Sequence, residues 1–417
     1  MNADVQKATL TAIAQVAIDS VVPSADWFAC LPAPPKGRCV VIGAGKASAL
    51  MAAELNCYWE GVPLSGIVAT RYGHGVCAGR VAVIEAGHPV PDENSERAAR
   101  AMLDAVVNLS KDDLVISLIS GGGSACCALP VEGIHLSQKQ KITQSLLRSG
   151  ASISEMNAVR KALSQVKGGQ LAKAAAPARV FNLIVSDIPG DVPEDVASGP
   201  TIPDTRRPLC AQKILEKYGL SEWKQYVPLY QHKESNDDVS VEYKIVASAR
   251  QALQRAAREA QKHGYKPVVL SDQFECDSQV LASIMAAIVK SAKTAGFPDK
   301  PPLAIISGGE TSVTISGKSY GRGGRNTEFV LALMKELKNC YGVGAIAVDS
   351  DGIDGTEDAA GAFLLSDSQF RAMENNLDLE EYLTKHDSYS FFKEMGDLFI
   401  TGPTLTNVND IRIILVN

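Results

Sequence analysis

The stretch LAIISGGETSVTISGKSYGRGGRNTEF, residues 303–329, shows most directly which class of fold this chain adopts. It opens with an apolar run, Leu303 to Ile306, which predicts a buried strand. A glycine-rich segment with two arginines, residues 321–326, follows, and a helical pattern starts at Thr327. A strand, a glycine turn and a helix start in this order predict an α/β unit whose loop turns backbone N–H groups toward an anion.

A similar order of elements occurs near residue 120. The apolar run Leu114–Ile119 predicts a strand, and the loop after it, residues 120–124, holds three glycines between two serines. Three consecutive glycines let a ligand approach the backbone closely, so ligand binding is favoured over a plain tight turn. Two such loops, far apart in the sequence, suggest two α/β units that face each other across a cleft.

Lys46 follows another strand and glycine turn, GRCVVIGAG, residues 37–45. A helical pattern begins immediately after it, and a cation at the first turn of a helix opposes the helix dipole. An anion bound at this point would relieve that conflict. The motif G-x-G-K-x-S is neither a full Walker loop nor a full dinucleotide fingerprint, so a tight turn with a solvated lysine explains the motif alone equally well.

Acidic residues follow the strand predicted at Phe181–Val185. Asp187 and Asp191 lie in a loop, residues 186–201, that is too rich in proline and glycine for a helix. Carboxylates at the carboxyl end of a strand are suitable Mg²⁺ ligands, and we modestly favour this interpretation over a solvated acidic turn. A further acidic cluster, residues 349–358, lacks the EF-hand pattern and is weak evidence for a metal.

Strands and helices alternate along the whole chain, which favours parallel or mixed sheets covered by helices. Residues 155–174 predict one helix with two interior glycines and a basic face. The polar segment 231–240 is the best linker candidate. We therefore predict an α/β protein of two domains: a Rossmann-like parallel sheet with helices on both faces at residues 1–238, and a second α/β domain at residues 239–417.

Composition narrows the function classes. The chain has 417 residues and a formal net charge of −6, and it has no basic block, which argues against nucleic acid as the main partner. It lacks both a membrane-length apolar run and a signal-peptide pattern, so we expect a cytoplasmic protein that does not bind membranes. Its nine scattered cysteines contain no C-x-x-C pair, which argues against a disulfide framework or a zinc site.

The chemistry that these residues suit best is phosphoryl transfer. No Ser–His–Asp arrangement or nucleophile elbow is visible, and the loop histidines His74 and His88 more often belong to solvated or structural positions. Glycine loops, a few cations and strand-end carboxylates are the groups that position phosphates and neutralise charge in a transition state.

Twelve motifs, in order along nearly the whole chain, carry a family resemblance: GAGKA, EAGHPVPDENS, LISGGGSA, NAVRK, KGGQLA, SDIPGD, ASGPTIPD, SGGET, GRGGRNTEF, DGIDG, AAGA and TGPTLTNVND. With them the chain resembles the class II glycerate kinases, whose C-terminal domain is of the MOFRL type. The resemblance implies ATP-dependent phosphorylation of D-glycerate to 2-phosphoglycerate, with Mg²⁺ or another divalent cation, in the cleft between two α/β domains. It matches the central lysine and arginine of that family to Lys46 and Arg325.

From the residues and the resemblance together we predict the site residues given below. We also consider a homodimer possible. The expected catalytic residues are Lys46, Arg325 and Asp191. The expected substrate-binding residues are Ser120, Gly121, Gly122, Gly123, Ser124, Asn157 and Arg160. The expected nucleotide-binding residues are Gly43, Gly45, Gly308, Gly309, Glu310, Arg322 and Asn326. The expected metal ligands are Asp187 and Asp191. Ala162 and Arg71 depart from the family pattern, which affects substrate detail more than reaction class.

Two alternatives stay open. Members of the same family have been named hydroxypyruvate reductases, which use NAD(P)H. The strand expected after Gly45 ends at Thr70 and Arg71 and so lacks the acidic ribose ligand of an NAD site, although Arg71 suits a 2′-phosphate. A non-catalytic, two-lobed anion-binding protein would also explain the glycine loops, but not the carboxylates that accompany Lys46 and Arg325.

Overall fold

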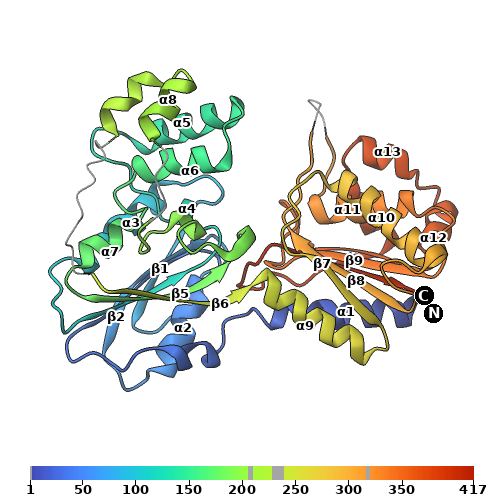
Figure 1. Cartoon of the computed structure of the whole chain (residues 1–417), viewed down its shortest axis with the longest axis horizontal. Coiled ribbons are helices and arrows are strands. Elements are labelled where there is room, and N and C mark those ends of the chain that lie inside the picture. The colour runs from blue at the N-terminus through green and yellow to red at the C-terminus, as the bar shows by residue number, and fades with distance from the viewer. Residues whose placement is uncertain (1, 205–209, 228–238, 316–319) are drawn as a thin grey trace. The chain divides into compact units, whose positions relative to one another are not determined.

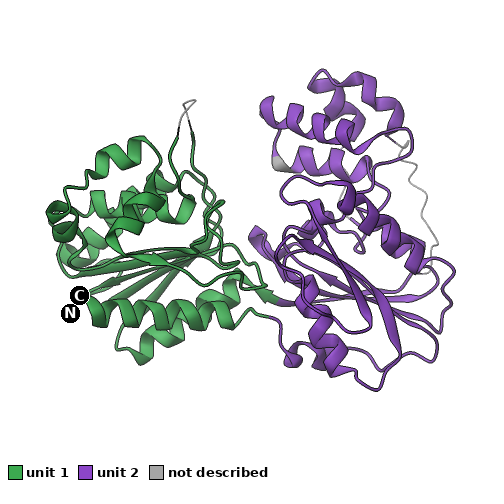
Figure 2. Cartoon of the chain, turned by 180° about the vertical axis from the view of Figure 1, so that it is seen from behind, with its two compact units in different colours: residues 1–22, 247–417 green, residues 23–246 purple. Residues whose placement is uncertain are grey.

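The computed structural model describes residues 2–204, 210–227, 239–315 and 320–417 (Figure 1). These residues form two compact units, one of residues 23–246 and one of residues 1–22 with 247–417 (Figure 2). The division differs from the expected 238/239 boundary in two ways: the N-terminal helix joins the C-terminal unit, and most of strand β6 (Val241–Ser248) stays with the first unit, whose sheet it extends. Residues 231–238 of the predicted linker lie outside the described residues.

The N-terminal helix, α1 (Ala3–Asp19), packs on the sheet of the second unit through fully buried side chains such as Leu10 and Ile13. The Gln6 side-chain oxygen accepts a hydrogen bond from the Ser366 backbone N–H at 2.7 Å. An amphipathic pattern predicts that a helix covers a core, but not which of two sheets supplies that core. For this reason the sequence pattern led us to assign α1 to the N-terminal domain, which follows it directly in the sequence.

The unit of residues 23–246 contains a six-stranded sheet in the order β3-β2-β1-β4-β5-β6. Strands β1 to β5 pair in parallel. This order, 3-2-1-4-5-6, is that of doubly wound dinucleotide-binding sheets, so the predicted Rossmann-like parallel sheet is confirmed. The strands are β1 (Cys39–Ala44), β2 (Leu64–Arg71), β3 (Val81–Ala86), β4 (Leu114–Ile119), β5 (Arg179–Ser186) and β6 (Val241–Ser248).

Helices cover both faces of this sheet (Figure 1). On one face lies α2 (Ser48–Tyr58), and on the other lie α3 (Glu93–Val106), α4 (Gly123–Cys126) and α7 (Gln170–Ala175). A further layer with its own apolar cluster is built by α5 (Leu136–Arg148), α6 (Ile153–Ala162) and α8 (Ala211–Lys217). Short 3₁₀ turns are η1 (Ala25–Cys30), η2 (Pro189–Asp191), η3 (Val196–Ser198) and η4 (Ser221–Tyr226).

The helix predicted at residues 155–174 is two helices, and that expectation was wrong. Helix α6 ends at Ala162, and α7 begins only at Gln170. Gly168 and Gly169 have φ values of +63° and +83°, which an α-helix does not contain. The helical periodicity continued through the break, so only the paired glycines signalled it.

The second unit contains a mixed sheet in the order β11-β10-β9-β12-β8-β7. Strands β7 and β8 are parallel, while β12 runs antiparallel to both β8 and β9. The strands are β7 (Lys266–Ser271), β8 (Leu303–Gly309), β9 (Val343–Asp349), β10 (Gly361–Leu364), β11 (Leu398–Phe399) and β12 (Asp410–Val416). The expectation of a second α/β domain is confirmed.

One face of this sheet is covered by α1 and α9 (Ala249–Lys262), and the other by the remaining helices (Figure 1). These are α10 (Ser278–Ala295), α11 (Arg325–Glu336), α12 (Ser368–Glu374), α13 (Leu379–Thr384) and α14 (Ser388–Met395). Phe329, Leu333 and Phe391 are fully buried in the core beneath them. Within the described parts of the chain, no helix combines the length and the apolar character needed to cross a bilayer.

Candidate active site

In the first unit, Lys46 lies where the strand order of the sheet reverses, between β1 and β4. Its backbone N–H donates to the Gly121 carbonyl at 2.9 Å, and the Ala47 N–H donates to the Ser120 hydroxyl at 3.0 Å. The loops that follow β1 and β4 are thereby joined at the carboxyl edge of the sheet. In doubly wound folds ligands bind at this reversal point, outside the carboxyl ends of the strands.

Gly45 makes this close approach of the two loops sterically feasible. A Cβ atom on Gly45 would lie 2.2 Å from the Ser120 hydroxyl oxygen, and its φ is +134°. Ser120 is fully buried, and Gly43 lies inside β1 against the carbonyl of Leu118. Gly43, Gly45 and Ser120 thus hold the loops together, which argues against the direct ligand contacts predicted for them.

His88 lies beside Lys46, which sequence reasoning did not predict. A Cβ atom on Gly122 would lie 3.1 Å from His88 Nε2 and 3.3 Å from Lys46 Cγ. His88 lies two residues beyond β3, so its position follows from the parallel sheet bringing the ends of β1, β3 and β4 to one edge. The motif EAGHPVPDENS was the available signal. Lys46 itself is only 8% exposed.

At the far end of the same loop, Ser124 contacts a second lysine. Lys167 Nζ donates to the Ser124 hydroxyl at 2.5 Å and also to the Ser124 carbonyl. The hydroxyl lies 3.1 Å from that of Ser198. Asn157 and Arg160 lie on α6, both partly exposed. The structure thus adds Lys167 to the predicted substrate-binding residues near Ser124.

The predicted metal ligands lie near the end of β5. Asp187 follows the last residue of this strand, and Asp191 ends the turn η2 in a left-handed conformation, with φ of +54°. Both are partly exposed. Among the residues that the structure describes, no group of three His, Cys, Asp or Glu side chains is arranged to hold a metal ion. The described residues therefore contain no metal site that is built from three or more such side chains.

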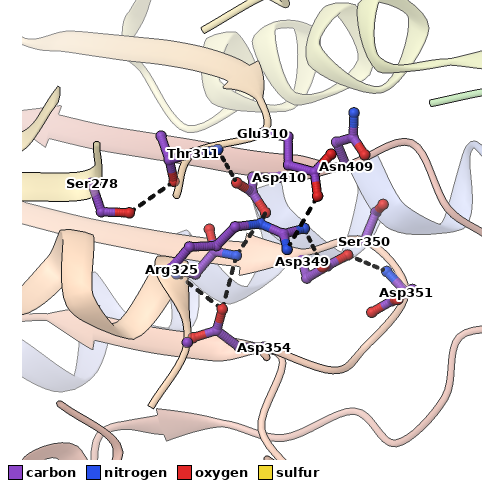
Figure 3. A network of polar contacts seen from close by, with 12 residues as sticks. Ser278, Glu310, Thr311, Arg325, Asp349, Ser350, Asp351, Asp354, Asn409 and Asp410 are labelled. Carbon is purple, nitrogen blue, oxygen red and sulfur yellow. Dashed lines mark hydrogen bonds and ion pairs between the residues drawn. The ribbon is translucent and has the colours of Figure 1, made fainter. Parts of the chain in front are cut away.

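In the second unit, Arg325 lies at the centre of a network of carboxylates (Figure 3). Its Nε donates to Asp410 at 2.8 Å and one terminal nitrogen, Nη2, donates to Asp349 at 2.6 Å. The other terminal nitrogen, Nη1, lies 3.4 Å from Glu310. Burial opposes the charged form of Arg325, but Asp410 and Asp349 outweigh it and raise the pKa of this guanidinium well above its ordinary value.

The sheet register explains why carboxylates so far apart in sequence meet here. Asp410 is the first residue of β12 and pairs with Gly309 on one side and with Asp349 on the other. Because β12 is antiparallel to β8 and β9, its start meets their ends at the same edge. Asp349 and Asp410 are 2% and 0% exposed, whereas the Glu310 side chain is 54% exposed. Two partners of Arg325 are thus fixed in the protein, and the third is open to solvent.

The anion site predicted at the start of α11 is occupied by the protein itself. Asp354 accepts from the backbone N–H groups of Asn326 and Thr327, at 2.9 and 2.8 Å. Burial raises the pKa of Asp354, and these hydrogen bonds partly offset that effect. The glycine-rich loop therefore positions Arg325, while the N–H groups of Asn326 and Thr327 at the helix start are already bound by Asp354.

The other predicted nucleotide-binding residues have different environments. Asn326 is fully buried, with its amide donating to Asp410 and Asp354, and Gly309 lies against the Phe274 backbone. Direct nucleotide contacts by these two are therefore disfavoured, and Gly308 is buried beside them. Arg322 is exposed, pairs with Glu357 and stacks 4.2 Å from the ring centroid of Tyr389.

A cavity of about 280 Å³ opens beside Arg325. Its walls combine polar groups with partly exposed apolar side chains, Ile315 and Tyr320, which are 44% and 62% exposed. Glu328, 1% exposed, lines it and accepts a hydrogen bond from Gln279 at 2.8 Å, while His386 Nδ1 lies 2.9 Å away. The cavity thus offers an apolar wall and a fixed guanidinium to one ligand.

Two family models match the chain. One, described as a domain of unknown function (DUF4147), matches residues 4–228, and the other, the MOFRL family, matches residues 303–410. The chain is 49% identical to an Agrobacterium vitis protein that is provisionally named a hydroxypyruvate reductase, over 98% of this chain and 94% of that protein. It is 37% identical to the D-glycerate 2-kinase of Thermotoga maritima, over 97% of both chains.

A solved structure is also similar to this chain over its whole length. The crystal structure of a glycerate kinase from Thermotoga maritima matches with a TM-score of 0.88 at 36% identity, over 99% of this chain and 100% of that one. Similarity at this level covers both units and the loops that carry Lys46 and Arg325. The chain therefore belongs to the glycerate kinase family whose members combine a DUF4147 domain with a MOFRL domain.

Proposed function

We propose that this protein transfers the terminal phosphoryl group of ATP to D-glycerate and forms 2-phosphoglycerate. The observation that carries the proposal is the geometry of Arg325. Two buried carboxylates orient its guanidinium, and among the described residues the ion-pair partner of its remaining terminal nitrogen is Glu310, which is exposed. A guanidinium fixed in this way suits the charge that develops on a transferring phosphoryl group.

Lys46 supplies the second cation in this proposal. It lies at the strand-order reversal of the parallel sheet, where the loops after β1 and β4 are hydrogen-bonded together. We assign it to the oxygens of the substrate or of the transferring group. Glu310 in turn acts as a replaceable partner of Arg325, which a phosphate oxygen displaces at little cost because that carboxylate is exposed.

A divalent cation fits the residues at the end of β5. Mg²⁺ in phosphoryl-transfer sites is bound by one or two carboxylates, by water and by the substrate phosphates. Asp187, and Asp191 four residues later, supply such carboxylates without a cage of protein ligands. When bound there, the ion would neutralise phosphate charge.

The name given to the Agrobacterium vitis relative makes a reductase the second candidate. In dinucleotide-binding sheets of this strand order, an acidic residue near the end of the second strand binds the ribose. Here β2 ends with Thr70 and Arg71, and the next residue is Tyr72. An NAD-dependent reductase is thus disfavoured. The activity assay must therefore exclude an NADPH-dependent reductase.

The test is a product assay with D-glycerate, ATP and Mg²⁺, in the absence of nicotinamide cofactors. We expect ADP and 2-phosphoglycerate, and phosphorus NMR distinguishes this isomer from 3-phosphoglycerate. Absence of product, together with oxidation of NADH or NADPH by hydroxypyruvate, would contradict the kinase and establish the reductase. Omission of D-glycerate controls for ATP hydrolysis by contaminating enzymes.

Variants at the end of β5 test the metal assignment. Replacing Asp187 or Asp191 by alanine is expected to raise the Mg²⁺ concentration needed for half-maximal activity by about tenfold, since a charged ligand of a metal is lost. A magnesium titration at saturating ATP and D-glycerate measures this. Glu222→Ala, in the surface turn η4, is a matched control. An unchanged titration in both variants would leave the two aspartates as structural turn residues.

A further inference from the structure

Lys167 is hydrogen-bonded to Ser124, two further basic side chains lie near enough to Lys167 for their charges to interact, and no ion pair among the described residues involves any of the three. Lys139 comes from α5, Arg160 from α6, and Lys167 from the segment between α6 and α7. The charge of Lys167 acts on Lys139, and the charge of Arg160 acts on both lysines. Segments from separate parts of the chain have therefore been folded into one cationic cluster.

The two lysines are the buried members of this cluster. Lys139 is 7% exposed and its Nζ has no hydrogen-bond partner in the described structure, while Lys167 is 3% exposed. Burial, together with the neighbouring positive charges, lowers the pKa of Lys139 well below its ordinary value. Burial likewise lowers the pKa of Lys167 to about 8. An unpaired, buried cluster of like charge destabilises the folded state, unless an anion joins it.

Lys161 shows what the fold does with a lysine that serves structure. It is adjacent to Arg160 in the sequence and is similarly enclosed, with a side chain that is 12% exposed. It forms ion pairs with Asp195 at 3.1 Å and with Asp204 at 2.7 Å. The absence of such carboxylates around Lys139 and Lys167, in the same unit and among the described residues, therefore points to a missing anionic ligand.

We propose that Lys139, Arg160 and Lys167, with the Ser124 hydroxyl, form the subsite for the carboxylate of a small 2-hydroxy acid. This proposal rests on the proposed kinase function and names its acid-binding subsite. The loop 120–124 links the cluster to the catalytic lysine, because Gly121 is hydrogen-bonded to the Lys46 backbone and Ser124 to Lys167.

Access to the subsite is through its partly exposed rim. Asn157, Arg160 and Ser124 are each partly exposed, whereas the two lysines beneath them are buried. Arg160 adds a planar donor pair that matches carboxylate geometry.

The variant Lys139→Met tests the proposal. It keeps the length of the side chain and removes the charge, so we expect KM for D-glycerate to rise by about 10- to 100-fold, which is the usual loss for a charged hydrogen-bond partner. KM for ATP should stay within about twofold, since that ligand does not contact the subsite. Lys141→Met removes an exposed lysine from the same helix and should change neither constant.

Stability provides an independent readout. Because the unpaired buried charge opposes folding, Lys139→Met should raise Tm of the ligand-free protein by about 2 °C or more. D-glycerate should raise Tm of the wild type and of Lys141→Met, but raise Tm of Lys139→Met much less. Higher intrinsic stability combined with weaker binding of the acid is not expected of a merely structural lysine.

The outcomes separate this proposal from the proposed function. Phosphoglycerate formation with an unchanged KM for D-glycerate in Lys139→Met would overturn the subsite and leave the kinase intact. A rise in KM for ATP alone would identify the cluster as a site for the nucleotide phosphates and would also overturn it. Binding of D-glycerate to the wild type without any turnover, together with its loss in Lys139→Met, would support the subsite and contradict the kinase.

Discussion

Arg325→Ala is expected to lower kcat for D-glycerate phosphorylation by at least about a hundredfold, because it removes a fixed donor to the charge of the transition state. Asp410 and Asp349 accept hydrogen bonds from two of the guanidinium nitrogens. The orientation of the third nitrogen, Nη1, is therefore fixed. A donor held in advance contributes more than a mobile one, since no reorganisation is needed during the reaction. Steady-state kinetics at saturating ATP and D-glycerate measure the effect.

The control for this variant must address folding. Alanine at position 325 removes a cation from the buried Asp349 and Asp410, and breaking a buried ion pair costs about 3–5 kcal/mol. Arg325→Lys keeps a positive charge between these carboxylates but loses the planar set of donors, so it should fold more stably and still lose most activity. Arg250→Ala removes an exposed arginine from the same unit and should keep activity. Near-normal turnover in folded Arg325→Ala would refute the assignment.

Lys46→Ala is expected to reduce kcat/KM by at least about a hundredfold while the fold stays intact. The hydrogen bonds from the Lys46 backbone N–H to Gly121 and from the Ala47 N–H to the Ser120 hydroxyl join the loops after β1 and β4, and alanine at position 46 keeps both. The lost activity should therefore come from the charge itself. Measuring kcat and KM for each substrate separately shows whether the ammonium group acts in binding or in the transition state.

Two controls show whether a loss of activity in Lys46→Ala comes from this side chain and not from a change in folding. Lys111→Ala removes an exposed lysine from the same unit and should leave both constants unchanged. Circular dichroism and the Tm of Lys46→Ala should match those of the wild type within a few degrees. If Lys46→Ala kept turnover close to that of the wild type, the lysine would be a structural residue of the turn and the catalytic assignment would be refuted.

The local order of strands, glycine turns and helices was sufficient to predict the fold class. Apolar runs at residues 114–119 and 303–306 correspond to β4 and the first part of β8, and the glycine turns after β1 and β4 are where they were expected, whereas Gly308 and Gly309 continue β8. These signals are local, since a strand and the turn that ends it occupy adjacent residues. The roles of Lys46 and Arg325 stay predictions, although the structure gives each of them a fixed position.

What only the tertiary structure decided is how distant side chains pair. Asp349 and Asp410 meet Arg325 because β12 enters the sheet antiparallel between β8 and β9, and no local pattern encodes that register. Asp354 likewise takes the helix start that the glycine loop was expected to offer to an anion. Lys167 belonged to the basic face expected at residues 155–174, and its burial next to Lys139 was not predicted, because a one-dimensional pattern does not show which elements cover a side chain. Periodicity reports one face of one element, whereas burial and charge pairing depend on which elements pack together in three dimensions.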